Sequence, residues 1–105
     1  MSALEFIKKM PEAFNPEVAG DLDATIQYQI STPAYTRIKD GNCTVEEGTA
    51  DSPDVTLIME DEDLVAMLTG ELNGMTAFMT GKLQIEGDLM LAQRVASLFD
   101  ASKVS

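Results

Sequence analysis

The sequence predicts a two-layer α+β domain in which helices cover one face of a sheet. Residues 22–31 alternate strictly between apolar and polar, which is typical of a strand with one covered and one solvated face. The first three predicted strands follow one another with short connections, which favours an antiparallel meander. The last third of the chain has apolar residues at helical spacing around one more short strand. A doubly wound fold is excluded, because its strands would be apolar on both faces.

The chain begins with helical patterns. Apolar residues in 3–14 predict a helix or a pair of helical turns, with Pro11 marking a break or a restart. Another short helical start is expected at 15–17. The first strand follows, and its predicted covered face consists of Leu22, Ala24, Ile26, Tyr28 and Ile30.

Two more strands are predicted at 35–39 and 43–48. The residues between them, Asp40-Gly41-Asn42, are a strong signal for a tight hairpin. Glu46 and Glu47 leave the third strand polar, as is common at the edge of a sheet.

The fourth strand, at 55–60, is expected to be more central than the third, because it carries Ile58 on the face opposite its other apolar residues. The acidic run 60–63 then leads into a helix, where acids in the first turn complement the helix dipole. Gly70 is expected to close this helix. The apolar positions of the helix are Leu64, Val65, Met67 and Leu68.

The final third predicts a helix, a strand and a helix around a common interior. Asn73 suits the N-cap of a helix that Gly81 ends. A strand is predicted over 82–86, and Asp88 can cap the last helix. The apolar side chains expected to face the interior are Met75, Phe78 and Met79 in the first helix, Leu83 and Ile85 in the strand, and Leu91, Val95 and Leu98, widened by Ala92, Ala96 and Phe99, in the last helix.

The net charge is the clearest feature of the composition. Eighteen acidic and seven basic residues give −11. This charge repels nucleic acid and anionic bilayers within about a Debye length, roughly 8 Å at physiological salt. No run approaches a membrane-spanning length and the N-terminus does not resemble a secretory signal, so we expect a cytoplasmic protein without stable membrane insertion. The lone Cys43 fits a reducing compartment.

The sequence lacks the residue patterns of common catalytic and metal sites. It has no histidine, so the commonest general base and every histidine-dependent triad are absent. Cys43 lies in a predicted strand, where a small packed thiol is a more ordinary role than a nucleophile. The acids of 60–63 do not form a calcium loop, and no glycine-rich phosphate loop is present. We therefore expect a protein that is not an enzyme and needs no cofactor or metal.

Two stretches resemble a known family. FMTGKLQIEGDLMLAQRVASLF is similar to the C-terminal half of the sterol carrier protein type 2 (SCP2) family, with its phenylalanine-containing helix, Gly-Lys-Leu strand and Ile-x-Gly-Asp turn. The upstream segment SPDVTLIMEDEDLVAMLTGELNGMTAFM also resembles the family, so the better match covers 52–99. The resemblance implies an SCP2-like fold, with a five-stranded mixed sheet and helices packed over one face, as a single lipid-binding domain over 1–105.

The same resemblance implies an apolar tunnel between sheet and helices that binds or transfers a sterol, a fatty acid, a quinone or a similar ligand. Five of the seven methionines fall between residues 59 and 90, and methionine repacks readily around ligands, although at helical spacing it is more often plain core. Bases are scarce after Lys39, which favours neutral ligands over those linked to coenzyme A. The last helix is the expected lid. The predicted lipid-binding residues are Leu64, Met67, Leu68, Met75, Phe78, Met79, Leu83, Ile85, Leu91, Val95, Leu98 and Phe99.

Two other functions stay open at this point. In the first, the domain is an interaction module with a filled core, whose exposed sheet face or last helix binds a protein partner or a second copy in a homodimer. In the second, it is an accessory factor that presents a quinone or another lipid to enzymes, which requires both a cavity and a partner. Uptake of a lipid, and a solution mass above that of the monomer, distinguish these functions.

Overall fold

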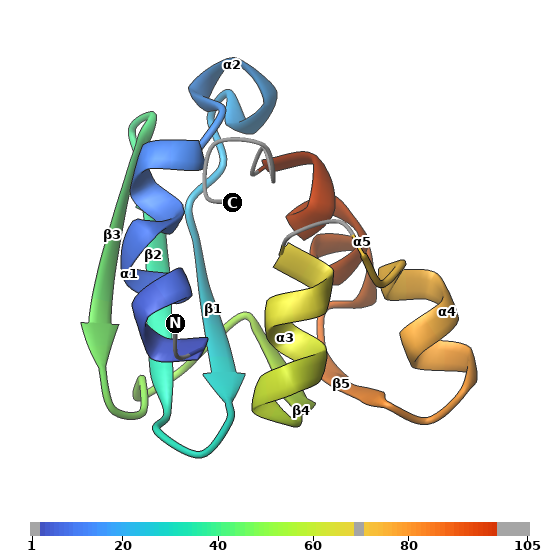
Figure 1. The fold of residues 1–105 in the computed structure, drawn as a ribbon. Helices are drawn as coiled ribbons and strands as arrows, with labels where there is room; N and C mark the ends of the chain where they lie inside the picture. The colour runs from blue at the N-terminus through green and yellow to red at the C-terminus, as the bar shows by residue number, and fades with distance from the viewer. Residues whose placement is uncertain (1–2, 69–70, 99–105) are drawn as a thin grey trace.

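The computed structural model of the protein describes residues 3–68 and 71–98, and it contains each helix and strand that the sequence predicts (Figure 1). Pro11 lies inside the first helix and does not divide it. The elements in order are α1 (Ala3–Ala13), α2 (Pro16–Ala19), β1 (Ala24–Gln29), β2 (Ala34–Lys39), β3 (Asn42–Glu47), β4 (Val55–Met59), α3 (Asp61–Leu68), α4 (Gly74–Met79), β5 (Leu83–Gly87) and α5 (Leu89–Leu98).

The five strands form one mixed sheet in the order β3-β2-β1-β4-β5. The first three strands are the predicted antiparallel meander, and β4 is central, as predicted, because it lies between β1 and β5. It pairs with β1 in parallel and with β5 in antiparallel orientation. The β2–β3 hairpin has a two-residue turn, with φ of 53° at Asp40 and 76° at Gly41, which is the left-handed geometry that a tight hairpin requires.

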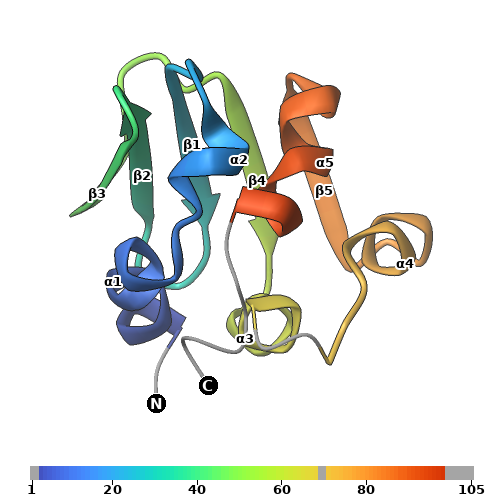
Figure 2. The same cartoon turned by 90° about the horizontal axis from the view of Figure 1, so that it is seen from above.

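The helices lie over one face of the sheet (Figure 2). Helix α1 packs on β2 and β3, α5 packs on β4 and β5, and α3 contacts α1. Helix α4 lies beside the edge strand β5 and contacts it. This arrangement confirms the predicted two-layer α+β architecture.

The core lies between this sheet face and the helices. Ile26 and Tyr28 of β1, which the alternation predicts to be inward, are fully buried, and so is Ile7 of α1. Inward residues of the neighbouring strands complete this layer, since β2 and β4 both alternate between buried and more exposed positions. The alternation in the sequence therefore identified the covered face correctly.

The opposite face of β1 differs from the prediction, because it is not solvated along its whole length. Gln27 is fully buried there, and its side chain donates to the carbonyl oxygens of Ala34 (3.2 Å) and Gly48 (3.1 Å) and accepts from the backbone N–H of Ala50 (2.8 Å). The cause is topological. Strand β4 pairs with β1 on the side away from β3, so the β3–β4 connection must cross β2 and β1, and it covers Gln27 as it crosses.

Candidate functional site

The elements α3, α4, β5 and α5 enclose one end of the interior, and side-chain caps begin two of these helices. Asn73 Oδ1 accepts from the backbone N–H of Met75 (2.8 Å) and Thr76 (3.4 Å), which confirms the predicted N-cap of α4. Helix α4 ends at Met79, two residues before Gly81, whose φ is 81°. At the start of α5, Asp88 Oδ1 accepts from two backbone N–H groups in the same way, as predicted.

Strand β5 presents its apolar side to this interior. Leu83 and Ile85 lie opposite Met59 and Leu57 of β4, on the face that the helices cover. Leu83 is buried, whereas Ile85 is only partly buried. Gln84 and Glu86 point to the other face and are exposed, so the predicted alternation of this strand is confirmed.

The predicted lipid-binding residues fall into three groups. Leu64, Leu83 and Leu91 are buried in the core. Met67 and Ile85 are partly buried and pack against that core. The side chains of Leu68, Val95 and Leu98, and all of Phe99, lie outside the described residues, as does the predicted helix end at Gly70.

The apolar face of α4 points outward, which corrects the expectation that it joins the common interior. Met75, Phe78 and Met79 are 55%, 45% and 78% exposed, whereas Ala77 is fully buried. In a helix with 3.6 residues per turn, residues two positions from Ala77 lie on the opposite side. Because α4 places Ala77 inward, Met75 and Met79 face solvent, while Phe78 lies to the side of the helix and is the least exposed of the three.

Partly buried apolar side chains surround the fully buried core at both ends of the interior. Around α1 and the meander, the largest core side chains, including Ile7, Ile26 and Ile38, are fully buried. Around α3, β5 and α5, several described apolar side chains keep some exposure although they pack on the core. These are Val65, Met67, Leu72, Ile85 and Ala92. Around α1 and the meander the corresponding residues are Leu4, Leu22, Ile30, Cys43 and Val45, so partial burial does not distinguish the two ends of the interior.

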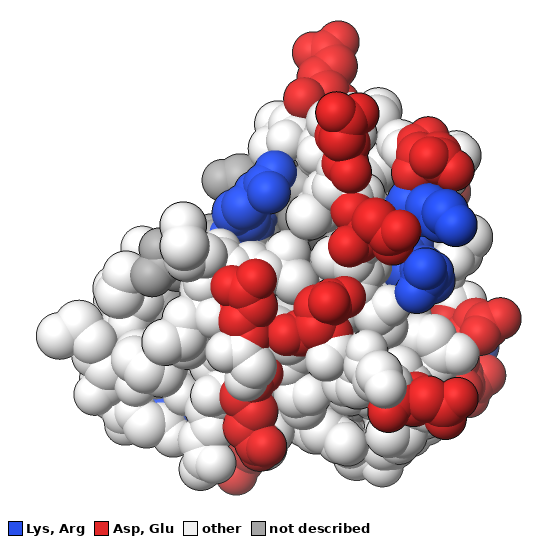
Figure 3. Space-filling view, turned by 180° about the vertical axis from the view of Figure 1, so that it is seen from behind, with Lys and Arg blue, Asp and Glu red and all other residues white. Residues whose placement is uncertain are grey.

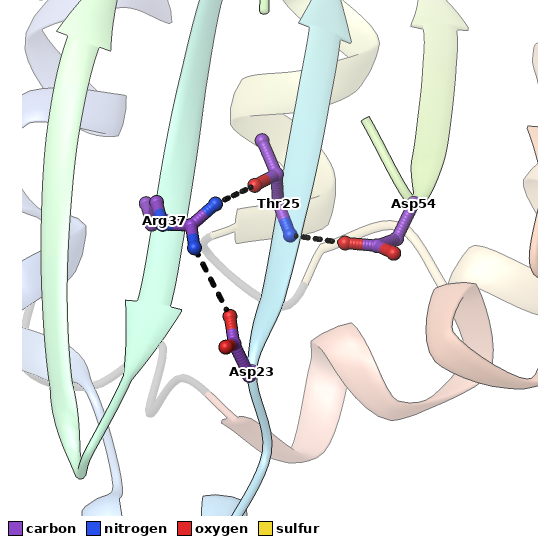
Figure 4. Close-up of polar contacts among 4 residues, drawn as sticks. All are labelled: Asp23, Thr25, Arg37 and Asp54. Carbon is purple, nitrogen blue, oxygen red and sulfur yellow. Dashed lines mark hydrogen bonds and ion pairs between the residues drawn. The ribbon is translucent and has the colours of Figure 1, made fainter. Parts of the chain in front are cut away.

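The other sheet face carries a polar groove of about 420 Å³, which sequence reasoning missed. Arg37 donates to Thr25 Oγ1 (3.0 Å) and pairs with Asp23 (3.3 Å), while Asp54 Oδ2 accepts from the Thr25 backbone N–H (2.7 Å) (Figure 4). These four residues thus serve as hydrogen-bond or ion-pair partners for one another. The groove is lined by Thr25, Tyr35, Arg37, Thr44, Glu46, Ala50, Asp51 and Ser52.

The titratable groups do not point to catalysis. Burial raises the pKa of the Cys43 thiol to about 11, so little of it is the reactive thiolate near neutral pH. Within residues 3–68 and 71–98, no three cysteine or acidic side chains are grouped so that they could hold a metal ion. In the same part of the chain, no helix is both long and apolar enough to cross a bilayer.

A model of the SCP-2 sterol transfer family matches residues 5–100. The chain belongs to this family. Peroxisomal multifunctional enzyme A from Dictyostelium discoideum is 38% identical over 68 residues, which are 64% of this chain and 15% of that protein. Sterol carrier protein 2 from Bos taurus is 39% identical over 61 residues, which are 58% of this chain and 11% of that protein. The chain thus matches only a small part of each of these SCP-2 relatives.

Solved structures agree with the SCP-2 assignment. Palmitated SCP2L2 from Aedes aegypti superposes with a TM-score of 0.75 and 28% identity, over 92% of this chain and 93% of that one. The sec-alkylsulfatase Pisa1 from Pseudomonas sp. has a TM-score of 0.82 and 19% identity, and the match covers 90% of this chain but 16% of the enzyme. At that identity the likeness to Pisa1 shows the fold alone.

Proposed function

We propose that residues 1–105 form a single domain that binds and transfers an apolar lipid without chemical conversion, in a tunnel between the sheet and the helices. Membership of the SCP-2 family supports lipid binding in general. The observation that carries the finer proposal is the partial burial of apolar side chains on α3 and β5, between the sheet and the helices. Met67 and Ile85 keep apolar surface that would still gain free energy from being covered by a ligand.

The proposed lining combines described and undescribed side chains. Among the described residues it comprises Leu64, Met67, Leu83, Ile85 and Leu91, and we add Leu68, Val95, Leu98 and Phe99 from the sequence pattern. Met75, Phe78 and Met79 are left out, because they face solvent. We retain the last helix as the lid, since α5 packs on β4 and β5, next to the proposed lining.

The affinity would come from transfer of hydrocarbon out of water. Each buried methylene contributes about 0.8 kcal/mol, so ten supply about 8 kcal/mol before the losses of association. Such binding discriminates weakly between chain lengths. A sterol, a fatty acid or a quinone satisfies this chemistry, and the solved structure of SCP2L2 from Aedes aegypti is that of the palmitated protein.

Ligands linked to coenzyme A fit the charges less well. After Lys39, the described residues contain only two bases, Lys82 and Arg94. Arg94 already donates to the Val18 carbonyl oxygen at 3.2 Å. Few cations are thus free to neutralise phosphates at the β5 end, and we propose a ligand without them.

Uptake of a fluorescent fatty acid by two tryptophan variants tests the tunnel. Ile85→Trp places a larger side chain in the proposed lining, and we expect it to weaken uptake at least tenfold. Val45→Trp is the matched control, because Val45 is also partly buried on the helix-covered face of the other edge strand. Equal effects of the two variants, or no uptake by the parent protein, would contradict the proposal.

The enzymes among the relatives do not imply catalysis here. The match covers 15% of Peroxisomal multifunctional enzyme A, so most of that enzyme has no counterpart in this chain. The absence of histidine from the sequence supports a carrier over a catalyst.

We propose the cytoplasm as the location of the protein. The sequence favours the cytoplasm, whereas Peroxisomal multifunctional enzyme A and Oleate-induced peroxisomal protein POX18 from Candida maltosa carry peroxisomal names. Fractionation of the source cells, with detection of the untagged chain, distinguishes the two compartments.

A further inference from the structure

The outward face of α4 is an apolar surface that the carrier function does not explain. Its three side chains, Met75, Phe78 and Met79, are all large and all 45% exposed or more. Helix α4 contacts β5, and its buried Ala77 provides the inward packing. The outward side chains thus contribute little to holding the helix in place, and covering them with a partner would gain free energy.

The charge around this face differs from that of the rest of the molecule. Lys82 is the only charged residue between Asn73 and Ile85, in a chain whose net charge is −11. In the space-filling view of the helix-free side, the part of the surface formed by α4 and its neighbours is almost entirely white, and the acidic side chains gather elsewhere (Figure 3). Glu71 and Glu86 are the nearest acidic residues in the sequence on either side of this stretch.

We propose that the outward face of α4 docks the protein, weakly and reversibly, onto an electrically neutral zwitterionic lipid bilayer. The proposal builds on the lipid-carrier function, since a carrier must exchange its ligand at a membrane. Methionine and phenylalanine side chains enter the boundary between headgroups and acyl chains, while Lys82 reaches the lipid phosphates. The acidic remainder of the surface disfavours anionic membranes, in agreement with the repulsion predicted from the sequence.

A second copy of the chain fits this face less well. Taking roughly 200 Å² as the full surface of a side chain of this size, the exposed fractions of the three residues leave about 350 Å². A stable interface buries about 800 Å² on each partner, so the α4 face supplies less than half of what a dimer needs. Two copies would also bring together two charges of −11.

Flotation with phosphatidylcholine vesicles tests the proposal, with Met79→Glu as the variant. We expect the parent protein to float with the vesicles and Met79→Glu to reduce the bound fraction at least tenfold. Met90→Glu is the matched control, because Met90 is 77% exposed against 78% for Met79 but lies in the first turn of α5, at the other end of β5. We expect this control to change the bound fraction less than twofold, and we expect phosphatidylserine added to the vesicles to weaken binding of the parent.

Two further measurements separate the possible failures. Uptake of a fluorescent fatty acid from solution should be the same for the parent and Met79→Glu, so a loss of flotation with intact uptake supports docking by α4. A parent that takes up the fatty acid but never floats overturns the docking proposal and leaves the carrier function standing. A solution dimer that Met79→Glu dissociates, equal losses for both glutamate variants, or stronger binding to anionic vesicles would also overturn it.

Discussion

Gly87, the last residue of β5, is where we expect a single methyl group to be most damaging. Its φ is 98°, and a Cβ added to it would lie 2.5 Å from the carbonyl oxygen of Asp54 and 3.2 Å from Val55 Cα. The same Asp54 oxygen accepts a hydrogen bond from the Asp88 backbone N–H at 3.0 Å, immediately before α5 begins. Gly87→Ala therefore pushes on the contact that joins β4 to the start of the last helix.

The size of the effect follows from three contributions. An alanine held at positive φ costs about 1–2 kcal/mol. Displacing the Asp54 peptide weakens its hydrogen bond with Asp88, worth about 1 kcal/mol, and overpacking adds about 1–3 kcal/mol. We expect Gly87→Ala to lower the free energy of unfolding by about 3–6 kcal/mol.

Urea unfolding followed by far-ultraviolet circular dichroism measures this loss, and Gly48→Ala is its control. Gly48 has a similar φ of 109°, but an added Cβ would meet nothing within 4 Å. The control should lose only the backbone contribution, about 1–2 kcal/mol. If both variants are destabilised equally, the close approach of Gly87 to Asp54 has no energetic consequence and the reasoning is refuted.

Three other predictions concern single side chains. Gln27→Ala removes three hydrogen bonds under the crossing connection and should cost about 2–3 kcal/mol in urea unfolding, against less than about 0.5 kcal/mol for the exposed Gln84→Ala; equal losses would contradict the buried network. Because burial raises its pKa to about 11, Cys43 should react with a disulfide reagent roughly a hundredfold more slowly in the folded protein than in urea, and similar rates would disprove this. The Ser31 side chain and backbone N–H donate to the Asp61 carboxylate and lower its pKa, so this contact stabilises the fold above the ordinary aspartate pKa and is lost as the pH falls through the lower folded value. Ser31→Ala should thus cost less than about 1 kcal/mol at about pH 7 and still less at about pH 3, and an undiminished cost in acid would rule out this linkage.

Features that depend on neighbouring residues were predictable from the sequence. The Asp40-Gly41 turn, the caps at Asn73 and Asp88 and the alternation in β5 are each specified within a few residues, and all are present. Within the candidate site this holds for β5, where Leu83 and Ile85 face the interior as the alternation requires. Local chemistry determines such features before distant parts of the chain meet.

Features that depend on distant contacts were not predictable in this way. Spacing places Met75, Phe78 and Met79 on one face of α4, but spacing does not say whether that face or Ala77 turns toward β5. Nothing near Gln27 indicates that residues 48–50 will cover it, because that burial follows from the parallel pairing of β1 with β4. Strand order, which no local pattern encodes, decided both the buried glutamine and the polar groove.

The parallel pairing of β1 and β4 also bears on how the protein is made. The three strands of the meander precede β4 in the chain, and each pairs with its neighbour in sequence, so they can pair while the ribosome is still adding the rest. Strand β4 can then pair with β1, which is already part of a sheet, and α3 to α5 are synthesised last. The more apolar second half of the chain, from β4 onward, is thus synthesised only after the strand on which it folds. This order shortens the time during which its apolar side chains can aggregate.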